Sequence, residues 1–409
     1  MLNQNNSEEI KSSFAKKERS KDAVLYLLEQ ARIQQVNLDY EQSRDSYKKA
    51  FALLDKQNNR AKVSISRVGF QALSMLSNDS VVPYLVAPYE QVLAHISQAK
   101  NYIYLKDTES ASVEMRIAQQ LQRDIELNHE KELEKKTSAQ SPAQLDQTLE
   151  GLDSITSRVK NTYQNSYAFY MAANLWEVIG EYNDALVDYK KAYELQPDPQ
   201  IAEDIKRVEL SSKHKITNQI PVIIFIEQGL VPQKVENKLA IPMPPNGILN
   251  IAFASYEPSS YSRPQTMNVS LNNHKIKNSY VLNDIGALAV KQLKEQTTTV
   301  VSNQILRATT KFVAQQQLGQ QFGPLGQIAG NLLNITTEHA DLRTWSTLPS
   351  NTQIARLSVP QGKHSLQLSS AGLNSDSLTL NAEKNQTIFV YAYHVNNKII
   401  LSSSSLSPH

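Results

Sequence analysis

The residues that most often perform chemistry are few in this chain, and they form no familiar pattern. The chain has no cysteine, which excludes disulfides, cysteine-ligated zinc, iron–sulfur clusters and thiol catalysis. Its eight histidines include no pair at the i, i+4 spacing of a helical metal site. A P-loop, a G-x-G-x-x-G turn and a G-x-S-x-G nucleophile elbow are also missing from the sequence. We therefore expect no catalytic, metal-binding or cofactor-binding residue, no cofactor, and no enzymatic activity.

Two short motifs have residue types suited to recognition, and each has two interpretations. They are Glu227-Gln228-Gly229 and Arg343-x-Trp345. In the structural interpretation, Gly229 occupies a turn that needs a positive φ, and Arg343 joins a hydrogen-bond network with Trp345 buried against a sheet. In the functional one, Arg343 offers planar donors and Trp345 a rigid anchor for a partner. We favour the structural interpretation, because tryptophans bounded by loops commonly fill the ends of sandwiches.

The elements that must position these motifs differ between the two halves of the chain. Residues 1–215 carry 28 basic and 31 acidic side chains, whereas 216–409 carry 14 and 9. Long stretches of the first half lack proline and glycine, but residues 219–265 are rich in both. This pattern predicts helices in the first half, followed by strands joined by turns. We predict a disordered segment at 1–20, a helical domain at 21–213 and a β-rich domain at 216–409.

The helical half contains a spacing typical of tetratricopeptide repeats. In such a repeat, small residues let two antiparallel helices approach, aromatic residues fill the space between them, and a glycine allows the tight turn. Weaker copies of the same register start near Leu27 and His95, which predicts a repeat solenoid. The clearest copy places these residues in register: Phe169, Ala173, Trp176, Gly180, Tyr182, Ala185, Tyr189, Ala192 and Pro197.

The second half alternates short β-rich runs with turn clusters, which is typical of a sandwich. Residues 283–340 change to a helical spacing, and we expect a helical insertion there. It is too rich in glutamine to span a bilayer, and we expect no transmembrane span anywhere in the chain. Its apolar side chains must cover something. We favour the β-domain's own open face over a partner protein or self-association.

Several segments together resemble a family of uncharacterised lipoproteins of Gram-negative bacteria with tetratricopeptide-like repeats and a C-terminal β-domain. The resemblance extends from about Lys21 to His394. Its most specific markers are the Glu227-Gln228-Gly229 turn with Pro232, and Asp341, Arg343, Trp345 and Pro349. The segments that carry it read RDSYKKAF, NDSVVPY, GEYNDALVDYKKAYELQP, IEQGLVPQK, ADLRTWSTLP and ARLSVPQGKH.

The resemblance implies a periplasmic or outer-membrane-associated protein, anchored by a lipidated cysteine after a signal peptide. Some relatives resemble neighbours of lipoproteins that activate peptidoglycan synthases, which implies partners in the cell envelope. This sequence departs from the family because it shows neither a leader nor a cysteine. We expect that the native start lies upstream or was removed; the alternative is a cytoplasmic protein. A lipid anchor requires a cysteine in such an upstream segment.

These observations together predict an α+β multidomain protein, with a tetratricopeptide-like solenoid followed by a sandwich-like β-domain with a helical insertion. The function that fits best is a non-catalytic scaffold or adaptor that binds protein partners, because stacked helix pairs build extended grooves. A hydrolase with an unrecognised site in the β-domain and a cytoplasmic scaffold remain as alternatives. The formal net charge of only +2 argues against nucleic acid as a partner.

Overall fold

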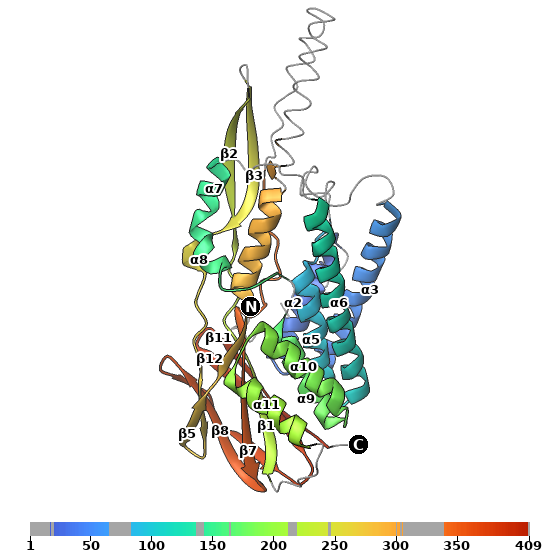
Figure 1. The fold of residues 1–409 in the computed structure, drawn as a ribbon, viewed down its shortest axis with the longest axis vertical. Helices are drawn as coiled ribbons and strands as arrows, with labels where there is room; N and C mark the ends of the chain where they lie inside the picture. The colour runs from blue at the N-terminus through green and yellow to red at the C-terminus, as the bar shows by residue number, and fades with distance from the viewer. Residues whose placement is uncertain are drawn as a thin grey trace, which may run out of the picture.

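The structure of the protein is a computed structural model, and Figure 1 shows its fold with helices and strands labelled. The structure describes residues 17, 20–64, 83–135, 143–162, 165–211, 219–243, 247–299, 301–302, 305 and 339–407. The predicted disorder of 1–20 therefore lies almost wholly outside the described residues. The same holds for residues 306–338, which make up most of the predicted insertion.

Helices precede strands along the chain, as the sequence predicted, and the β-rich part contains mixed sheets. The α-helices are α2 (Ala23–Val36), α3 (Tyr40–Ser64), α5 (Pro88–Tyr104), α6 (Thr108–Lys135), α7 (Ala143–Leu149), α8 (Asp153–Thr156), α9 (Ser166–Val178), α10 (Tyr182–Leu195) and α11 (Pro199–Ser211). The 3-10 helices are η1 (Glu150–Leu152) and η2 (Pro258–Ser260). Residues 285–299 form a further helix, within the range predicted for the insertion.

The strands form two five-stranded sheets and one separate two-stranded hairpin. They are β1 (Gln219–Gln228), β2 (Lys234–Met243), β3 (Gly247–Tyr256), β4 (Asn268–Leu271), β5 (His274–Asn278), β6 (Tyr280–Asp284), β7 (Asn351–Pro360), β8 (Gly362–Ser370), β9 (Leu373–Asn374), β10 (Leu378–Ala382), β11 (Thr387–Val395) and β12 (Lys398–Leu406). The first sheet has the order β12-β11-β1-β7-β6, with β1 and β11 parallel. The second has the order β10-β8-β4-β5, with β9 paired to β8, and β2 pairs with β3.

The first sheet is buried on both faces, and two of its central strands carry continuous apolar runs rather than alternating ones, Val222 to Ile226 in β1 and Ile388 to Tyr393 in β11. Successive side chains of a strand point to opposite faces. Val222, Ile224 and Ile226 of β1 therefore join the core between the two sheets. Ile223 and Phe225 join a separate core beneath the helices. The result is three layers: helices, first sheet and second sheet.

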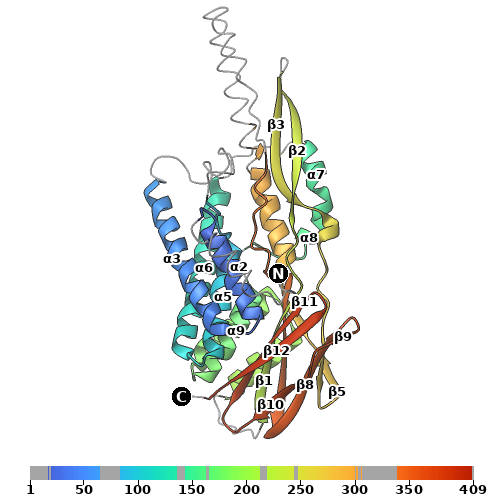
Figure 2. The ribbon, with the colours of Figure 1, turned by 180° about the vertical axis from the view of Figure 1, so that it is seen from behind.

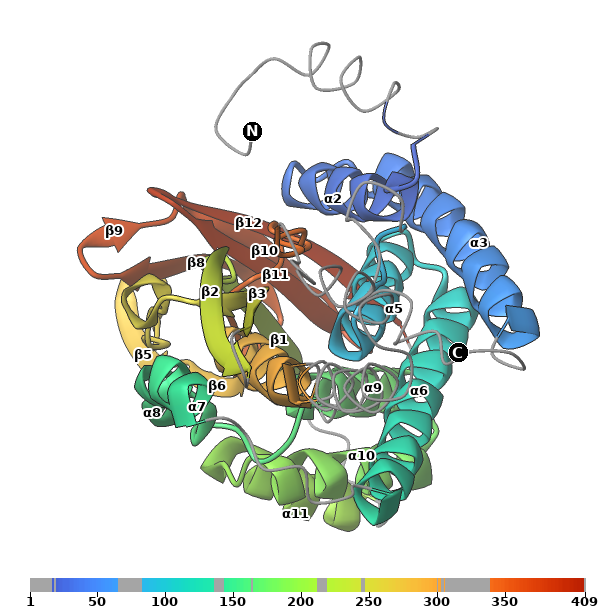
Figure 3. The same cartoon turned by 90° about the horizontal axis from the view of Figure 1, so that it is seen from above.

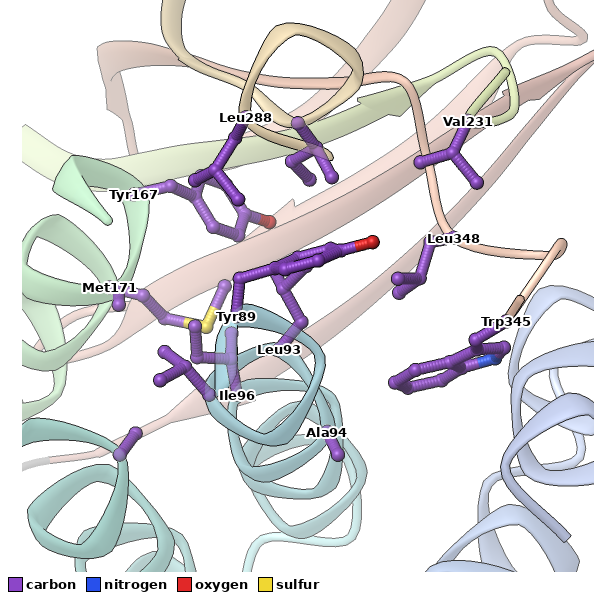
Figure 4. Close-up of a cluster of buried hydrophobic side chains, with 14 of the residues drawn as sticks. Tyr89, Leu93, Ala94, Ile96, Tyr167, Met171, Val231, Leu288, Trp345 and Leu348 are labelled. Carbon is purple, nitrogen blue, oxygen red and sulfur yellow. The ribbon is translucent and has the colours of Figure 1, made fainter. Parts of the chain in front are cut away.

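The helices form an arc around the strands, which Figure 3 shows from above. Three antiparallel pairs, α2–α3, α5–α6 and α9–α10, supply most of this layer. The first helix of the later pairs lies on the sheet, since α5 contacts β12 and α9 contacts β6 and β7. Figure 4 shows how Tyr89 and Leu93 of α5 and Tyr167 and Met171 of α9 converge with Leu288 in this core. Helices and strands thus share one hydrophobic core.

The β2–β3 hairpin projects beyond the two sheets, as Figures 1 and 2 show. Its buried residues, including Leu249 and Phe253, belong to the core that lies beneath the helices. The helix at 285–299 crosses beside it, and Lys291 of this helix donates from Nζ to the carbonyl oxygens of Val159 (2.9 Å) and Lys160 (2.9 Å). A segment from the first half of the sequence therefore closes one side of the β-rich part.

The predicted boundary between 213 and 216 falls between the end of α11 at Ser211 and the start of β1 at Gln219. Independent folding of residues 21–213 stays a prediction. Because helices and strands share a core, the fragment alone would expose to water the faces of α5 and α9 that cover the strands. A far-UV thermal melt of the isolated fragment tests it, and a non-cooperative melt would contradict it.

Candidate functional site

The Glu227-Gln228-Gly229 motif lies at the end of β1, where strand geometry sends its first two side chains to opposite faces. Glu227 points to the helices and forms ion pairs with Arg32 of α2 and Lys100 of α5. All three side chains are at most 5% exposed. The motif's carboxylate therefore ties the first sheet to two helices rather than facing a substrate.

Burial and charge act against each other in this cluster. Burial raises the pKa of Glu227, but the positive charges of Arg32 and Lys100 outweigh it, and the pKa lies below its ordinary value. Burial lowers the pKa of Lys100 to about 8, against the attraction of Glu227. Both cations also lie over the ring of Tyr393, at 5.2 and 5.6 Å from its centroid. The aromatic face supplies part of the stabilisation that one carboxylate cannot give two cations.

Gln228 and Gly229 complete a polar cap at the end of the first sheet. The side-chain oxygen of Gln228 accepts from Asn351 Nδ2 (3.2 Å) and Gln353 Nε2 (3.0 Å). Gly229 has a φ of +70°, and a Cβ there would lie 3.1 Å from Ser350 Oγ. Only glycine adopts this left-handed conformation at low cost. These placements match the structural interpretation of the motif.

The second motif belongs to a segment, residues 341–348, that lies against the helices. Trp345 is fully buried, with its ring 6.3 Å from that of Tyr47 in an edge contact. Trp345 lies against Tyr47 of α3, not at the end of a sheet as its sequence context predicts. The cause is the path of the segment, which Glu29 of α2 holds by accepting from the backbone nitrogens of Ser346 (2.6 Å) and Thr347 (3.2 Å).

Arg343 acts within the same segment and is largely covered. Its guanidinium pairs with Asp22 and with Asp341 (2.6 Å). Its carbonyl oxygen accepts from Lys234 Nζ (2.9 Å). The residue therefore connects the segment to the start of α2 and to β2. Because Trp345 is buried, this pair does not present an aromatic anchor at the surface.

The residues predicted to pack in the clearest repeat lie between and around α9 and α10. Gly180 has a φ of +86° in the turn between these helices, and Pro197 follows α10 and is exposed. Tyr182 differs from the prediction, because it is 52% exposed. It is the first residue of α10, so its side chain extends beyond the contact between the helices. The buried members are Phe169, Ala173, Trp176, Ala185, Tyr189 and Ala192.

An open groove of about 520 Å³ lies on the outer side of the helical layer, between α6 and α10, with α9 at its base. We call it the α6–α10 groove. Three apolar side chains rise from its walls although they are well exposed: Val113 (53%), Ile117 (38%) and Val187 (60%). The complete lining is Val113, Arg116, Ile117, Gln119, Gln120, Arg123, Trp176, Asp184, Val187 and Asp188.

The base of the groove is organised around Trp176. Its indole Nε1 donates to Asp188 Oδ2 (2.6 Å), and Gln119 Nε2 donates to the same oxygen (2.5 Å). The guanidinium of Arg116 lies 4.7 Å from the centre of the indole and 3.4 Å from Asp184. Burial raises the pKa of Asp188 to about 6, although these hydrogen bonds oppose it. Trp176 is itself only 1% exposed, so beneath the groove it holds Asp188 and Arg116 in place rather than offering its own ring to a partner.

The sequence did not predict this groove, although it singled out one of its residues. Trp176 was assigned to helix packing, and Val113, Ile117 and Val187 were not singled out. The signal in the sequence that could have revealed the walls is the position of their apolar residues around the helix. Ala111, Met115 and Ala118 mark the buried stripe of α6, and an apolar residue out of phase with such a stripe faces solvent. Apolar residues that repeat out of phase therefore indicate a contact surface.

Other parts of the described chain are weaker candidates for a functional site. A smaller depression of about 290 Å³ lies between α8 and the helix at 285–299, lined by charged and threonine side chains. Among the described residues, no three His, Asp or Glu side chains come together as metal ligands would. None of the described helices is long and apolar enough to cross a membrane. The α6–α10 groove is therefore the best candidate site.

Comparison with known proteins adds no family assignment. The chain matches no protein-family model, and none of the curated proteins is significantly similar to it in sequence.

Proposed function

We propose that this protein is a non-catalytic interaction protein, and that the α6–α10 groove binds a segment of a partner protein. The observation that carries the proposal is the set of exposed apolar side chains, Val113, Ile117 and Val187, around an open groove between two helices. Apolar side chains gathered in a surface groove are the usual feature of a contact site. Arginine is among the most frequent energetic anchors of interfaces, and Arg116 and Arg123 line the groove.

The architecture supports a role for the outer side of the helical layer. We propose that the pairs α2–α3, α5–α6 and α9–α10 are tetratricopeptide-like repeats. Their small residues at the predicted contacts, such as Ala31, Ala99 and Ala173, are fully buried. The inner side of this layer is covered by the protein's own first sheet. A partner that the repeats bind would then use an outer surface, and the α6–α10 groove is one.

The cell-envelope location and partners in peptidoglycan synthesis are proposals that rest on the family resemblance alone. The proposal that the α6–α10 groove binds a partner does not depend on these two proposals, since the same groove would serve a scaffold in any compartment. No observation in the described residues favours the alternative of a hydrolase site in the β-domain.

A peptide selection tests the proposed function directly. The full-length chain is immobilised and a random peptide library is selected against it, and the affinity of recovered peptides is measured by fluorescence anisotropy. We expect Val187→Glu to weaken binding at least about tenfold, because it places a charge in the desolvated contact. Leu210→Glu is the matched control, since Leu210 is equally exposed (68%) but lies on α11, outside the groove.

Both variants change exposed side chains, so the fold should persist, and far-UV circular dichroism verifies this. Recovery of peptides that bind both variants equally would show that the groove is not the site. Failure to recover any binding peptide would equally count against the proposal.

A further inference from the structure

We propose that the occupant of the α6–α10 groove is an amphipathic α-helix of the partner, with an acidic flank beside α6 and a basic flank beside α10. This inference rests on the proposed function, because it names the kind of segment that the same groove binds. Four features of the two groove walls lead to it.

Both walls of the groove are helices. The backbone N–H and C=O groups of α6 and α10 are paired within each helix, away from the helix ends. An extended peptide gains affinity chiefly by adding a strand to an open sheet edge, and the groove has no such edge. A helix pairs its own backbone groups and needs only side-chain contacts from the walls.

The polar side chains of the walls are already paired with one another. Gln119 donates to Asp188 (2.5 Å) and Gln120 to Asp124 (2.7 Å). Arg123 donates to the side-chain oxygen of Gln120 (2.9 Å). An extended backbone entering the groove would lose water while Gln119 and Gln120 stay bonded to their present partners, so its own polar groups would be left unpaired at a cost in affinity. A helix avoids this cost.

The apolar side chains have the spacing of a helical contact. Val113 and Ile117 are one turn apart on α6, and Val187 stands on α10 across the groove. From Val113 to Arg123 the wall is about 15 Å long at 1.5 Å per residue. That length matches about three turns of a partner helix, whose apolar residues at i, i+4 and i+7 would pack between the two walls.

The two walls carry opposite charges. Arg116 and Arg123 come from α6, whereas Asp184 and Asp188 come from α10. The ion pair between Arg116 and Asp184 is exposed (59% and 46%) and 3.4 Å long, and such pairs contribute little to stability. Both charges therefore remain available to a ligand. A partner helix with acidic residues on one side of its apolar seam and basic residues on the other complements both walls.

Two matched peptide libraries test the inference against the intact chain. Both have an apolar seam at i, i+4 and i+7 and random flanks, and the second carries prolines in the middle that prevent a helix. Binders are measured by fluorescence anisotropy with the wild-type chain and with Val187→Glu and Leu210→Glu. We expect groove-dependent binders from the helical library only, with acidic residues enriched on one flank and basic residues on the other.

Charge reversal tests the orientation. Arg123→Glu should weaken peptides with an acidic flank about tenfold, and peptides with that flank made basic should recover the loss. Arg123 is exposed, and the denaturation midpoint confirms that the variant is folded.

Groove-dependent binders that come only from the proline library would overturn the helix while leaving the proposed function in place. Flanks without charge bias, or a charge reversal without effect, would overturn the orientation. Groove-dependent binders from neither library would overturn the helix and the proposed function together.

Discussion

Asp188→Asn should stabilise the protein at neutral pH, although it alters a residue of the candidate site. Asp188 is only 6% exposed, and burial raises the pKa of its carboxyl from 3.8 to about 6. The folded state therefore favours the neutral acid, which asparagine imitates in shape and charge. Asparagine also retains an oxygen that can accept the hydrogen bond from Trp176.

The sign and magnitude follow from proton linkage. Because the folded pKa lies above the unfolded one, the contribution of this group to stability is complete below pH 3.8 and is lost as pH rises through 6. At about 1.4 kcal/mol for each tenfold change in the acid constant, the loss is about 3 kcal/mol. The free energies of unfolding of wild type and variant should agree near pH 4. They should diverge up to about pH 6 and stay about 3 kcal/mol apart above pH 7, with the variant more stable.

Urea denaturation from pH 4 to pH 8 measures this difference, followed by tryptophan fluorescence. Trp176 is a suitable reporter, because it donates directly to Asp188. Asp184→Asn removes an exposed carboxylate from the same groove and controls for the change of net charge. A difference that does not vary with pH, or a variant that is less stable at pH 7.5, would refute the reasoning.

Three further substitutions test the packing around the site, each measured by the urea midpoint. Glu227→Gln should destabilise the protein by about 3–5 kcal/mol, because it leaves two buried cations without their counter-charge; a midpoint equal to that of Glu41→Gln, on the exposed side of α3, would contradict this. Ala185→Leu should cost about 1–3 kcal/mol by overfilling the contact of α10 with α9, and an unchanged midpoint would count against a repeat-like packing. Trp345→Ala should cost about 3–5 kcal/mol by opening a cavity against α3, with faster hydrogen exchange at Ser346 and Thr347; normal exchange there would show that the tryptophan does not hold the 341–348 segment.

Much of the local structure could be predicted from the sequence because it depends on short-range spacing. Small residues at helical intervals predicted buried contacts, and Ala173, Ala185 and Ala192 are fully buried. The glycines at 180 and 229 were assigned to turns, and both have a positive φ. Tyr182 was assigned to the same packing but is exposed, since a helix register does not reveal which first-turn side chain extends past the neighbouring helix.

The candidate site could be predicted only in part, because a groove is a property of two surfaces. The sequence identified Trp176 as an aromatic packing residue, but its hydrogen bond to Asp188 needs α9 and α10 to meet at one angle. The walls required α6 to lie against that pair, and α6 begins 58 residues before α9. Periodicity gives no information on which helices become neighbours across such a separation.

The sequence by itself determined the order of helices before strands, the apolar faces of each element and the turns that glycine permits. These follow from side-chain periods of 3.6 and 2 and from backbone sterics, which act over a few residues. The tertiary structure alone decided that Glu227 meets Arg32 and Lys100, that Trp345 is buried against α3, and that the helical layer covers the first sheet. The contacts of Glu227 and Trp345 join residues more than a hundred positions apart. They form because burying one shared apolar core brings the distant segments together.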